Sequence, residues 1–238
     1  MNTTKLMPEL LVNSSLREID NRIYSIYEDA MSSPYDAKAK VYEWLVQKYW
    51  YNKIIWGTSP WDYAEFAENS IVNAKDILLD IGCGGLSQTV RLYSTIENPL
   101  VLLDYSIEML KLGRERILKS FGVLPSNIIF LQANAFNLPF ADNTFDGIMS
   151  FGMIHMFDNK NQFIQESMRV LKPEGHFNFS VLTTNRILGK RYLTFLSKKN
   201  EVGTPVSTEN LLSLLTPFSN TICYYIKGNM LFVRGRKL

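Results

Sequence analysis

The sequence predicts an α/β protein whose core is a doubly wound, mostly parallel sheet of seven strands. Three observations support this fold class. In the central part of the chain, short apolar runs alternate with amphipathic segments, which is the pattern of successive βα units. A glycine-rich turn directly follows the first of these runs, as in Rossmann-like sheets. The last two apolar runs are separated by Lys227-Gly228-Asn229 and are expected to pair as a C-terminal antiparallel hairpin.

The expected strands are short, apolar on both faces and bounded by Gly, Pro, Asn or Asp, as buried parallel strands are. Five of them form the central sheet, at residues 77–81, 100–105, 128–132, 145–151 and 177–182. The two strands of the hairpin are expected at residues 222–226 and 230–234.

Capping residues mark the helices between these strands. Ser106 is an N-cap candidate for a helix that runs to about Phe121, and Gly122 is a stop signal after it. Asp158 is an N-cap candidate for a second helix, which Lys172-Pro173 ends. We therefore expect amphipathic helices that cover the sheet.

The 238 residues are enough for one sizeable core, and we expect a single domain. Residues 75–182 carry the alternating pattern and form its core. Residues 1–74 are interpreted as an N-terminal helical cap or lid, in which one helix begins at Ser59-Pro60. Residues 183–238 begin with an irregular basic stretch and continue as a short helix near 208–215 and the hairpin.

All four tryptophans lie in one stretch of the N-terminal segment, at Trp44, Trp50, Trp56 and Trp61. Apolar pairs recur every four residues over 41–50, which indicates a helix. Two interpretations stay open. The rings form a lid over a ligand cleft, with Trp56 and Tyr63 as candidate substrate contacts, or they pack the N-terminal helices onto the sheet.

The net charge and the two cysteines restrict which partners and which cellular location are expected. The chain has 25 Lys plus Arg and 23 Asp plus Glu, and this balance disfavours a dedicated nucleic-acid binder and favours a small-molecule substrate. Cys83 and Cys223 form no disulfide framework and no metal-ligand cluster, so we expect no metal and a reducing, cytoplasmic location. No apolar run is long enough to span a membrane, and a monomer or homodimer is expected.

The first strand ends in Asp80-Ile81-Gly82-Cys83-Gly84-Gly85, where glycines let the backbone approach a ligand closely. Ser87 stands where a dinucleotide fingerprint requires its third glycine, which disfavours NAD. A second acid, Asp104, ends the next strand and suits the two hydroxyls of a ribose. Asp80 is suited to an ammonium or sulfonium group, and a helix N-terminus beyond the glycines to a carboxylate. An amino acid joined to a nucleoside meets all three conditions.

With these residues in place, the chain resembles the class I S-adenosylmethionine-dependent methyltransferases over about residues 75–182. The resemblance continues past the glycine turn in three further segments, LLDYSIEML, QANAFNLPFADNTFDGIMSFGMIHMF and MRVLKPEGHFNFS. Within that family, the chain is similar to the small-molecule subgroup that includes the ubiquinone and menaquinone biosynthesis C-methyltransferases.

The resemblance implies a set of cofactor contacts. The methionine part would be held by Asp80, Gly82, Cys83 and Gly84, the ribose by Asp104, the adenine by Tyr105, Met109, Asn134, Ala135 and Phe136, and the floor of the site would be lined by Ser150 and Phe151. At Asn134 the family commonly has an aspartate, so the adenine would meet a neutral acceptor here. The Asn-Pro-Pro-Tyr-like motif of amino-methylating DNA enzymes is replaced by residues 150–153, which disfavours a DNA base as substrate.

His155 follows the fourth strand, where the resemblance places the reacting methyl group. It is a candidate general base and substrate contact, and the alternative is a histidine that only shapes the pocket wall. The favoured function is methyl transfer from S-adenosylmethionine to a small molecule, with S-adenosylhomocysteine as product and no metal required. A cofactor-binding regulatory or scaffold protein without turnover is the main alternative, and an NAD-dependent oxidoreductase is a weaker one.

Overall fold

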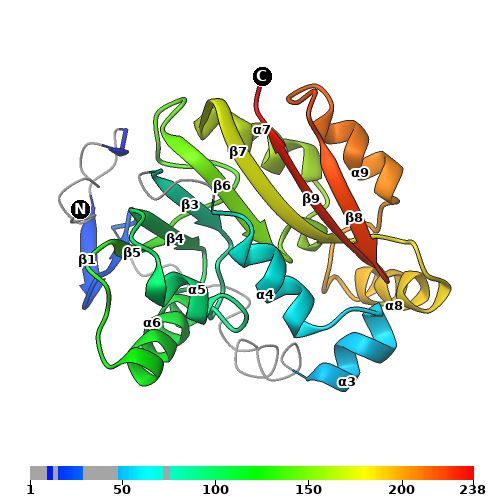
Figure 1. Ribbon diagram of the computed structural model, residues 1–238, viewed down its shortest axis with the longest axis horizontal. Helices are drawn as coiled ribbons and strands as arrows, with labels where there is room; N and C mark the ends of the chain where they lie inside the picture. Colours follow the sequence, from blue (N-terminus) through cyan, green and yellow to red (C-terminus); the bar gives the residue numbers. More distant parts are fainter. Residues whose placement is uncertain (1–9, 13–15, 29–47, 72–75) are drawn as a thin grey trace.

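The computed structural model describes residues 10–12, 16–28, 48–71 and 76–238 of the chain. Its strands form one nine-stranded sheet in the order β1-β2-β5-β4-β3-β6-β7-β9-β8 (Figure 1). The strands are β1 (Arg17–Asp20), β2 (Ile23–Ser25), β3 (Leu78–Ile81), β4 (Leu100–Asp104), β5 (Ile128–Gln132), β6 (Phe145–Phe151), β7 (Leu171–Leu182), β8 (Cys223–Lys227) and β9 (Met230–Arg236). The six strands from β2 to β7 in this order are parallel.

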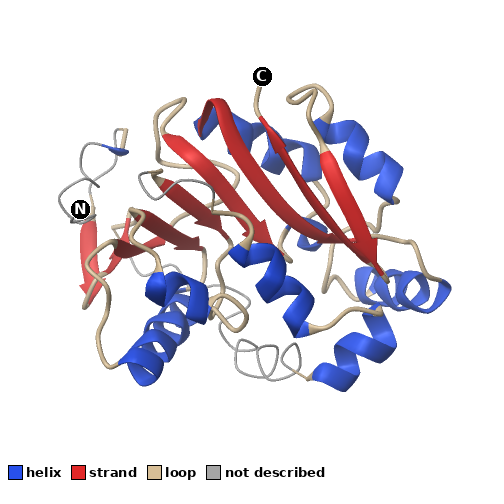
Figure 2. Ribbon diagram, in the orientation of Figure 1, coloured by secondary structure: helices blue, strands red, loops and turns tan. Residues whose placement is uncertain are grey.

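Helices lie on both faces of this sheet (Figure 2). They are α3 (Tyr49–Tyr51), continued by a π-helical segment (Asn52–Trp56), then α4 (Pro60–Glu68), α5 (Val90–Thr95), α6 (Ile107–Phe121), α7 (Lys160–Val170), α8 (Ile187–Lys198) and α9 (Thr208–Leu215), with a short 3-10 helix at Ile154–Met156. The predicted fold class is therefore confirmed. All seven predicted strands are present, and β8 and β9 form the expected antiparallel hairpin.

The order of the strands determines where a ligand can bind. The chain proceeds from β3 to β4 and β5 on one side, and then returns to place β6 on the other side of β3. The chain therefore builds the sheet outward from β3 on one side, with β4 and β5, and then on the other side, with β6. In open α/β sheets the crevice at the carboxyl ends of the strands, at this point of reversal, is where ligands bind.

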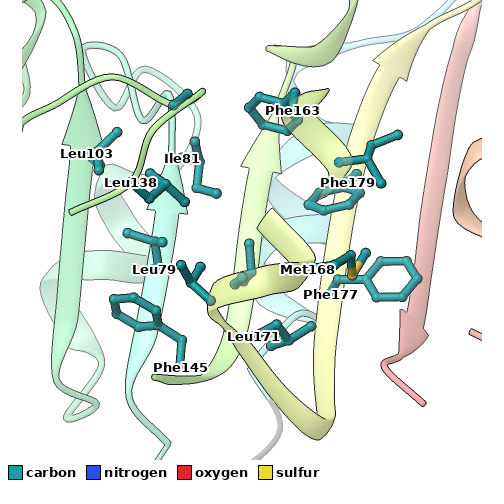
Figure 3. Close-up of a cluster of buried hydrophobic side chains, with 14 of the residues drawn as sticks. Leu79, Ile81, Leu103, Leu138, Phe145, Phe163, Met168, Leu171, Phe177 and Phe179 are labelled. Atoms are coloured by element: carbon teal, nitrogen blue, oxygen red, sulfur yellow. The ribbon is translucent and has the colours of Figure 1, made fainter. Parts of the chain in front are cut away.

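Two separate apolar layers hold the helices to the sheet. On one face, side chains of α7 and α9 pack on alternate residues of the strands, such as Leu79, Ile81 and Phe179 (Figure 3). On the other face, α5 and α6 cover the intervening residues, including Leu78 and Leu102. Each fully buried side chain of this size contributes about 1.5 to 3 kcal/mol to the free energy of folding. The strands that carry the site are therefore held firmly between two layers of helices.

The caps of α6 agree with the sequence. The Ser106 hydroxyl accepts the backbone N–H of Met109 at 3.2 Å, and the helix ends at Gly122, whose φ is 75°. Ser59 caps α4 in the same way, as part of a capping box with Asp62. The Ser106 cap places the start of α6 directly after the end of β4.

Several predicted details are wrong. Within the segment expected to be a helical cap, β1 and β2 add two strands to the edge of the sheet beside β5. The basic stretch expected to be irregular forms the helix α8. The N-cap of α7 is Asn159 rather than Asp158, and that helix ends before Lys172-Pro173. Most of the expected helix at 41–50, including Trp44, lies outside the described residues.

Two features are absent from the described residues. No helix among them has the length and apolar character needed to cross a membrane. No group of three or more His, Cys, Asp or Glu side chains among them is placed to hold a metal ion.

Candidate active site

A cavity of about 1010 Å³ opens at the carboxyl ends of the parallel strands. One part of its wall comes from the glycine turn after β3 and from the residues that follow β4 and β5. Another part comes from the π-helical segment, α4 and α8. The cavity therefore lies where the reversal of strand order predicts a ligand site.

The glycine turn contacts the strand beside it through backbone groups. The N–H groups of Gly82 and Cys83 both donate to the carbonyl of Leu103, at 2.8 and 3.0 Å. Gly82 has a φ of 75°, and a Cβ at this position would lie 2.6 Å from Cγ of Met153. A side chain here would meet both backbone strain and steric conflict, so glycine is required for the turn.

Asp104 links this turn to the start of α6. One carboxylate oxygen accepts the backbone N–H of Gly84 at 2.9 Å, and the other accepts the N–H of Ser106 at 2.9 Å. The side chain is mostly buried and lines the cavity. Each carboxylate oxygen can accept more than one hydrogen bond, so a carboxylate at this position is suited to a ligand hydroxyl.

Asp80 lies deeper, and the structure shows why it is suited to a cation. Its Oδ2 accepts the hydroxyl of Tyr93 at 2.8 Å, whereas Oδ1 is buried without a partner. Burial raises the pKa of Asp80 to about 7; the Tyr93 hydrogen bond opposes this shift and the nearby Asp104 carboxylate adds to it. A positively charged ligand group would satisfy the free oxygen and stabilise the ionised form.

The predicted adenine contacts lie together around the end of β4 and β5. The cavity wall there contains Tyr105, Met109, Asn134, Ala135 and Phe136. The side-chain oxygen of Asn134 accepts the N–H of Phe136 at 2.9 Å, which holds this loop in a tight turn. The amide that replaces the common aspartate therefore has a structural partner of its own.

At the floor of the cavity, the two predicted residues separate. Phe151 lines the cavity, at the carboxyl end of β6. Ser150 is fully buried outside the wall, and its hydroxyl donates to the carbonyl of Ile81 at 2.8 Å. This difference follows from the alternation of side chains along a strand, which directs neighbours to opposite faces.

His155 lines the cavity from the 3-10 helix after β6. Burial, with a smaller effect of the Lys160 charge, lowers the pKa of this imidazole to about 3. Its Nδ1 accepts the backbone N–H of Leu182 at 3.5 Å, so the neutral ring carries its proton on Nε2. An imidazole in this state is a weak base and offers an N–H donor instead.

The aromatic stretch divides between the cavity and the surface. Trp56 and Tyr63 both line the cavity, as predicted from the sequence, while Trp50 and Trp61 are exposed. The ring of Trp56 lies 5.5 Å from that of Tyr192, between centroids, and the ring of Tyr63 lies 5.7 Å from Phe232. These rings join the lid segment to α8 and to the hairpin, so they serve packing as well as the cavity wall.

Sequence reasoning missed the contribution of α8. Tyr192, Leu193, Phe195 and Leu196 of this helix line the cavity, as does Lys199 directly after it. The signal was present, because apolar residues recur at 188, 192, 193 and 196 with helical spacing. Lys190 and Arg191 lie between these apolar positions and make the helical pattern harder to recognise. The buried Tyr93 that donates to Asp80 was also missed, because its neighbours in the sequence, such as Arg91 and Ser94, do not distinguish it from an exposed residue.

Comparisons with known proteins are consistent with this geometry. Residues 79–179 match the family model for the methyltransferase domain. The ubiquinone/menaquinone biosynthesis C-methyltransferase of Pseudomonas savastanoi pv. phaseolicola is 38% identical over 132 residues, which are 52% of this chain and 50% of that protein. The match thus spans about half the length of this curated relative.

Among solved structures, an S-adenosylmethionine-dependent methyltransferase from Thermotoga maritima is similar with a TM-score of 0.60 and 19% identity, over 84% of this chain and 99% of that one. Geranyl diphosphate C-methyltransferase from Streptomyces coelicolor A3(2), solved with S-adenosylhomocysteine bound, has a TM-score of 0.59 and 14% identity, over 74% of this chain and 76% of that one. These structural similarities show a shared fold. Residues 79–179 of this chain are therefore similar in sequence to a methyltransferase domain, and the described fold is the one seen in these methyltransferase structures.

Proposed function

We propose that this protein transfers the methyl group of S-adenosylmethionine to a small, largely apolar acceptor. The observation that supports this most directly is the cavity of about 1010 Å³, which is at the upper end of the range of ligand pockets, about 300 to 1,000 Å³. It has room for a cofactor and a second molecule. Its lining includes the carboxylates Asp80 and Asp104, called here the acidic side, and a second group of mostly aromatic residues, called here the aromatic side: Trp56, Tyr63, Phe151 and Leu193.

The acidic side fits the cofactor. Asp104 is placed to accept the ribose hydroxyls, because its carboxylate lines the cavity at the end of β4. Asp80 is placed to receive the ammonium group, because its Oδ1 is buried and unpaired. When bound, S-adenosylmethionine supplies a methyl group already activated on a sulfonium.

The aromatic side fits the acceptor. Trp56, Tyr63, Phe151 and Leu193 present apolar surface, and Trp56 is almost wholly buried. We propose that these residues orient the acceptor for in-line transfer and exclude water from the reacting atoms. His155 would donate its Nε2–H to an oxygen or nitrogen of the acceptor rather than remove a proton.

The main alternative is a protein that binds the cofactor without turnover. Isothermal titration with S-adenosylmethionine, followed by measurement of S-adenosylhomocysteine over a panel of apolar phenols, enols, thiols and amines, separates the two. We expect one molecule bound per chain and product with at least one acceptor class. Binding without product across the panel would favour the regulatory alternative, and absence of binding would contradict both.

A further inference from the structure

We propose that the surface formed by α3, the π-helical segment and α8 docks onto an anionic lipid membrane. This surface lies at one end of the molecule, where α3 and α8 are neighbours (Figure 1). The inference concerns where the protein acts and does not depend on the methyl acceptor. It rests on apolar exposure, on charge and on the relation of this surface to the cavity.

The first observation is a concentration of exposed apolar side chains on two short segments. Between about half and three quarters of each side chain is exposed; the residues are Tyr49, Trp50, Ile54, Ile187, Leu188 and Phe195. A contiguous group of large apolar side chains at the surface of a protein indicates a site of interaction. Tyrosine and tryptophan are also the side chains that favour a membrane–water interface.

The second observation is the charge that surrounds these side chains. Residues 48–56 and 186–199 contain seven Lys or Arg and no Asp or Glu, whereas the whole chain has 25 basic and 23 acidic residues. The five cations of the second segment, Arg186, Lys190, Arg191, Lys198 and Lys199, are all exposed. None of the described acidic side chains forms an ion pair with these five.

The third observation is that the two segments form one continuous surface. Tyr51 and Trp56 pack against Tyr192 of α8, with centroid separations of 6.4 and 5.5 Å. The guanidinium of Arg186 lies against Gly57, directly after the π-helical segment. The same two segments line the cavity on their inner side, and Phe195 and Lys199 are both exposed and part of its wall.

Cations beside exposed aromatic and aliphatic side chains are the pattern of helices that lie in a membrane interface. Anionic headgroups would neutralise the cations, and the acyl boundary would take up the aliphatic side chains. A nucleic acid would satisfy the cations but would leave Ile54, Ile187 and Leu188 in water. The lipid surface therefore accounts for both halves of the pattern, and it would place the cavity mouth next to a store of apolar molecules.

The test is co-sedimentation of the full chain with phosphatidylcholine vesicles that contain or lack phosphatidylglycerol, at low and high salt. We expect binding only to the anionic vesicles and weaker binding at high salt. The double variant Lys190→Gln/Arg191→Gln should lower the partition coefficient about 30-fold, and Ile54→Ser/Ile187→Ser about tenfold or more. None of these four residues lines the cavity, so affinity for S-adenosylmethionine should be unchanged.

A matched control is available at the C-terminal end of α6, away from this surface, where Lys119 in the helix and Val123 just after it are both exposed. The double variant Lys119→Gln/Val123→Ser should bind vesicles like the wild type. The proposal is overturned if the wild type fails to bind anionic vesicles, if the surface variants bind as well as the control, or if a single-stranded oligonucleotide binds as tightly as the vesicles. It is also overturned if the variants only convert a dimer to a monomer. Cofactor titration of the same samples reports separately on the proposed function.

Discussion

Replacement of Asp104 by asparagine tests the cofactor assignment in one step. The carboxylate accepts two backbone N–H groups, from Gly84 and Ser106, and would accept the ribose hydroxyls with its remaining capacity. In Asp104→Asn one oxygen becomes an NH₂ donor, and the other loses its charge. Because hydrogen bonds to a charged group are worth about 1.5 to 3 kcal/mol, the dissociation constant for S-adenosylmethionine should rise roughly 10- to 150-fold.

Isothermal titration measures this change, and a thermal melt shows whether the variant folds. Asp142→Asn is the matched control, because Asp142 is an exposed carboxylate paired with Arg169 at the far end of β6. It should bind the cofactor like the wild type. A folded Asp104→Asn protein with an unchanged dissociation constant would refute the ribose assignment. If the asparagine variant does not fold, Asp104→Glu keeps the charge and should show a smaller loss of affinity.

Three further predictions concern the buried ionisable groups. Asp80 has a pKa raised to about 7 in the free protein, so it must lose its proton to pair with an ammonium group. Cofactor affinity should therefore increase as the pH rises to about 7 and level off above it; titrations across this range that show no such increase would contradict the pairing. Tyr93→Phe removes the hydrogen bond that opposes the raised pKa of Asp80, so the midpoint of that pH dependence should move upward, and a midpoint that stays in place would show that the bond does not matter. His155→Gln should lower the turnover number less than tenfold, because loss of a true general base costs about 10²- to 10⁴-fold, and a loss in that larger range would restore the base assignment.

The parts of the fold that sequence predicted best have strong local signals. The five central strands are continuous apolar runs because both faces of a parallel sheet are buried. The limits of α6 follow from Ser106 and Gly122, which meet the two distinct requirements of a helix start and a helix end. Here local and tertiary preferences agree, and the elements lie where they were expected.

The elements that were missed have weak or conflicting local signals. β1 and β2 contain only four and three residues, too few for a period to be recognised, and they are strands because β5 offers an open edge. In α8 the cations interrupt the apolar spacing, and the helix is held by contacts of Tyr192 with distant Tyr51 and Trp56. Such contacts depend on the folded chain and cannot be inferred from neighbours in sequence.

The candidate site shows the same division. Asp80, Asp104, Gly82 and Gly84 were identified from their places at or after strand ends, and all four lie in the cavity wall. Of the two residues predicted at the floor, Phe151 lines the cavity, whereas the side chain of Ser150 points to the opposite face of the strand. The state of His155 depends on its burial and on the Leu182 N–H, neither of which can be inferred from its place in the chain.

The fold positions a cofactor but does not by itself select an acceptor, because one fold supports many reactions. On the aromatic side of the cavity, Trp56, Tyr63 and Leu193 come from the segments before β3 and after β7, and Phe151 comes from β6. Variation in those segments can alter the acceptor while the cofactor platform stays constant. Of the described tryptophans, Trp56 lines the cavity whereas Trp50 and Trp61 are exposed, so Trp56 is the one proposed for the acceptor side.

A crystal structure with S-adenosylhomocysteine tests the central claim most directly. We expect the ribose hydroxyls to bind Asp104 and the amino group to lie within hydrogen-bonding distance of Asp80 Oδ1. Beyond the sulfur we expect an open space that is bounded by Trp56, Tyr63 and Leu193. S-adenosylhomocysteine bound elsewhere, or bound with its sulfur facing away from this aromatic wall, would contradict it.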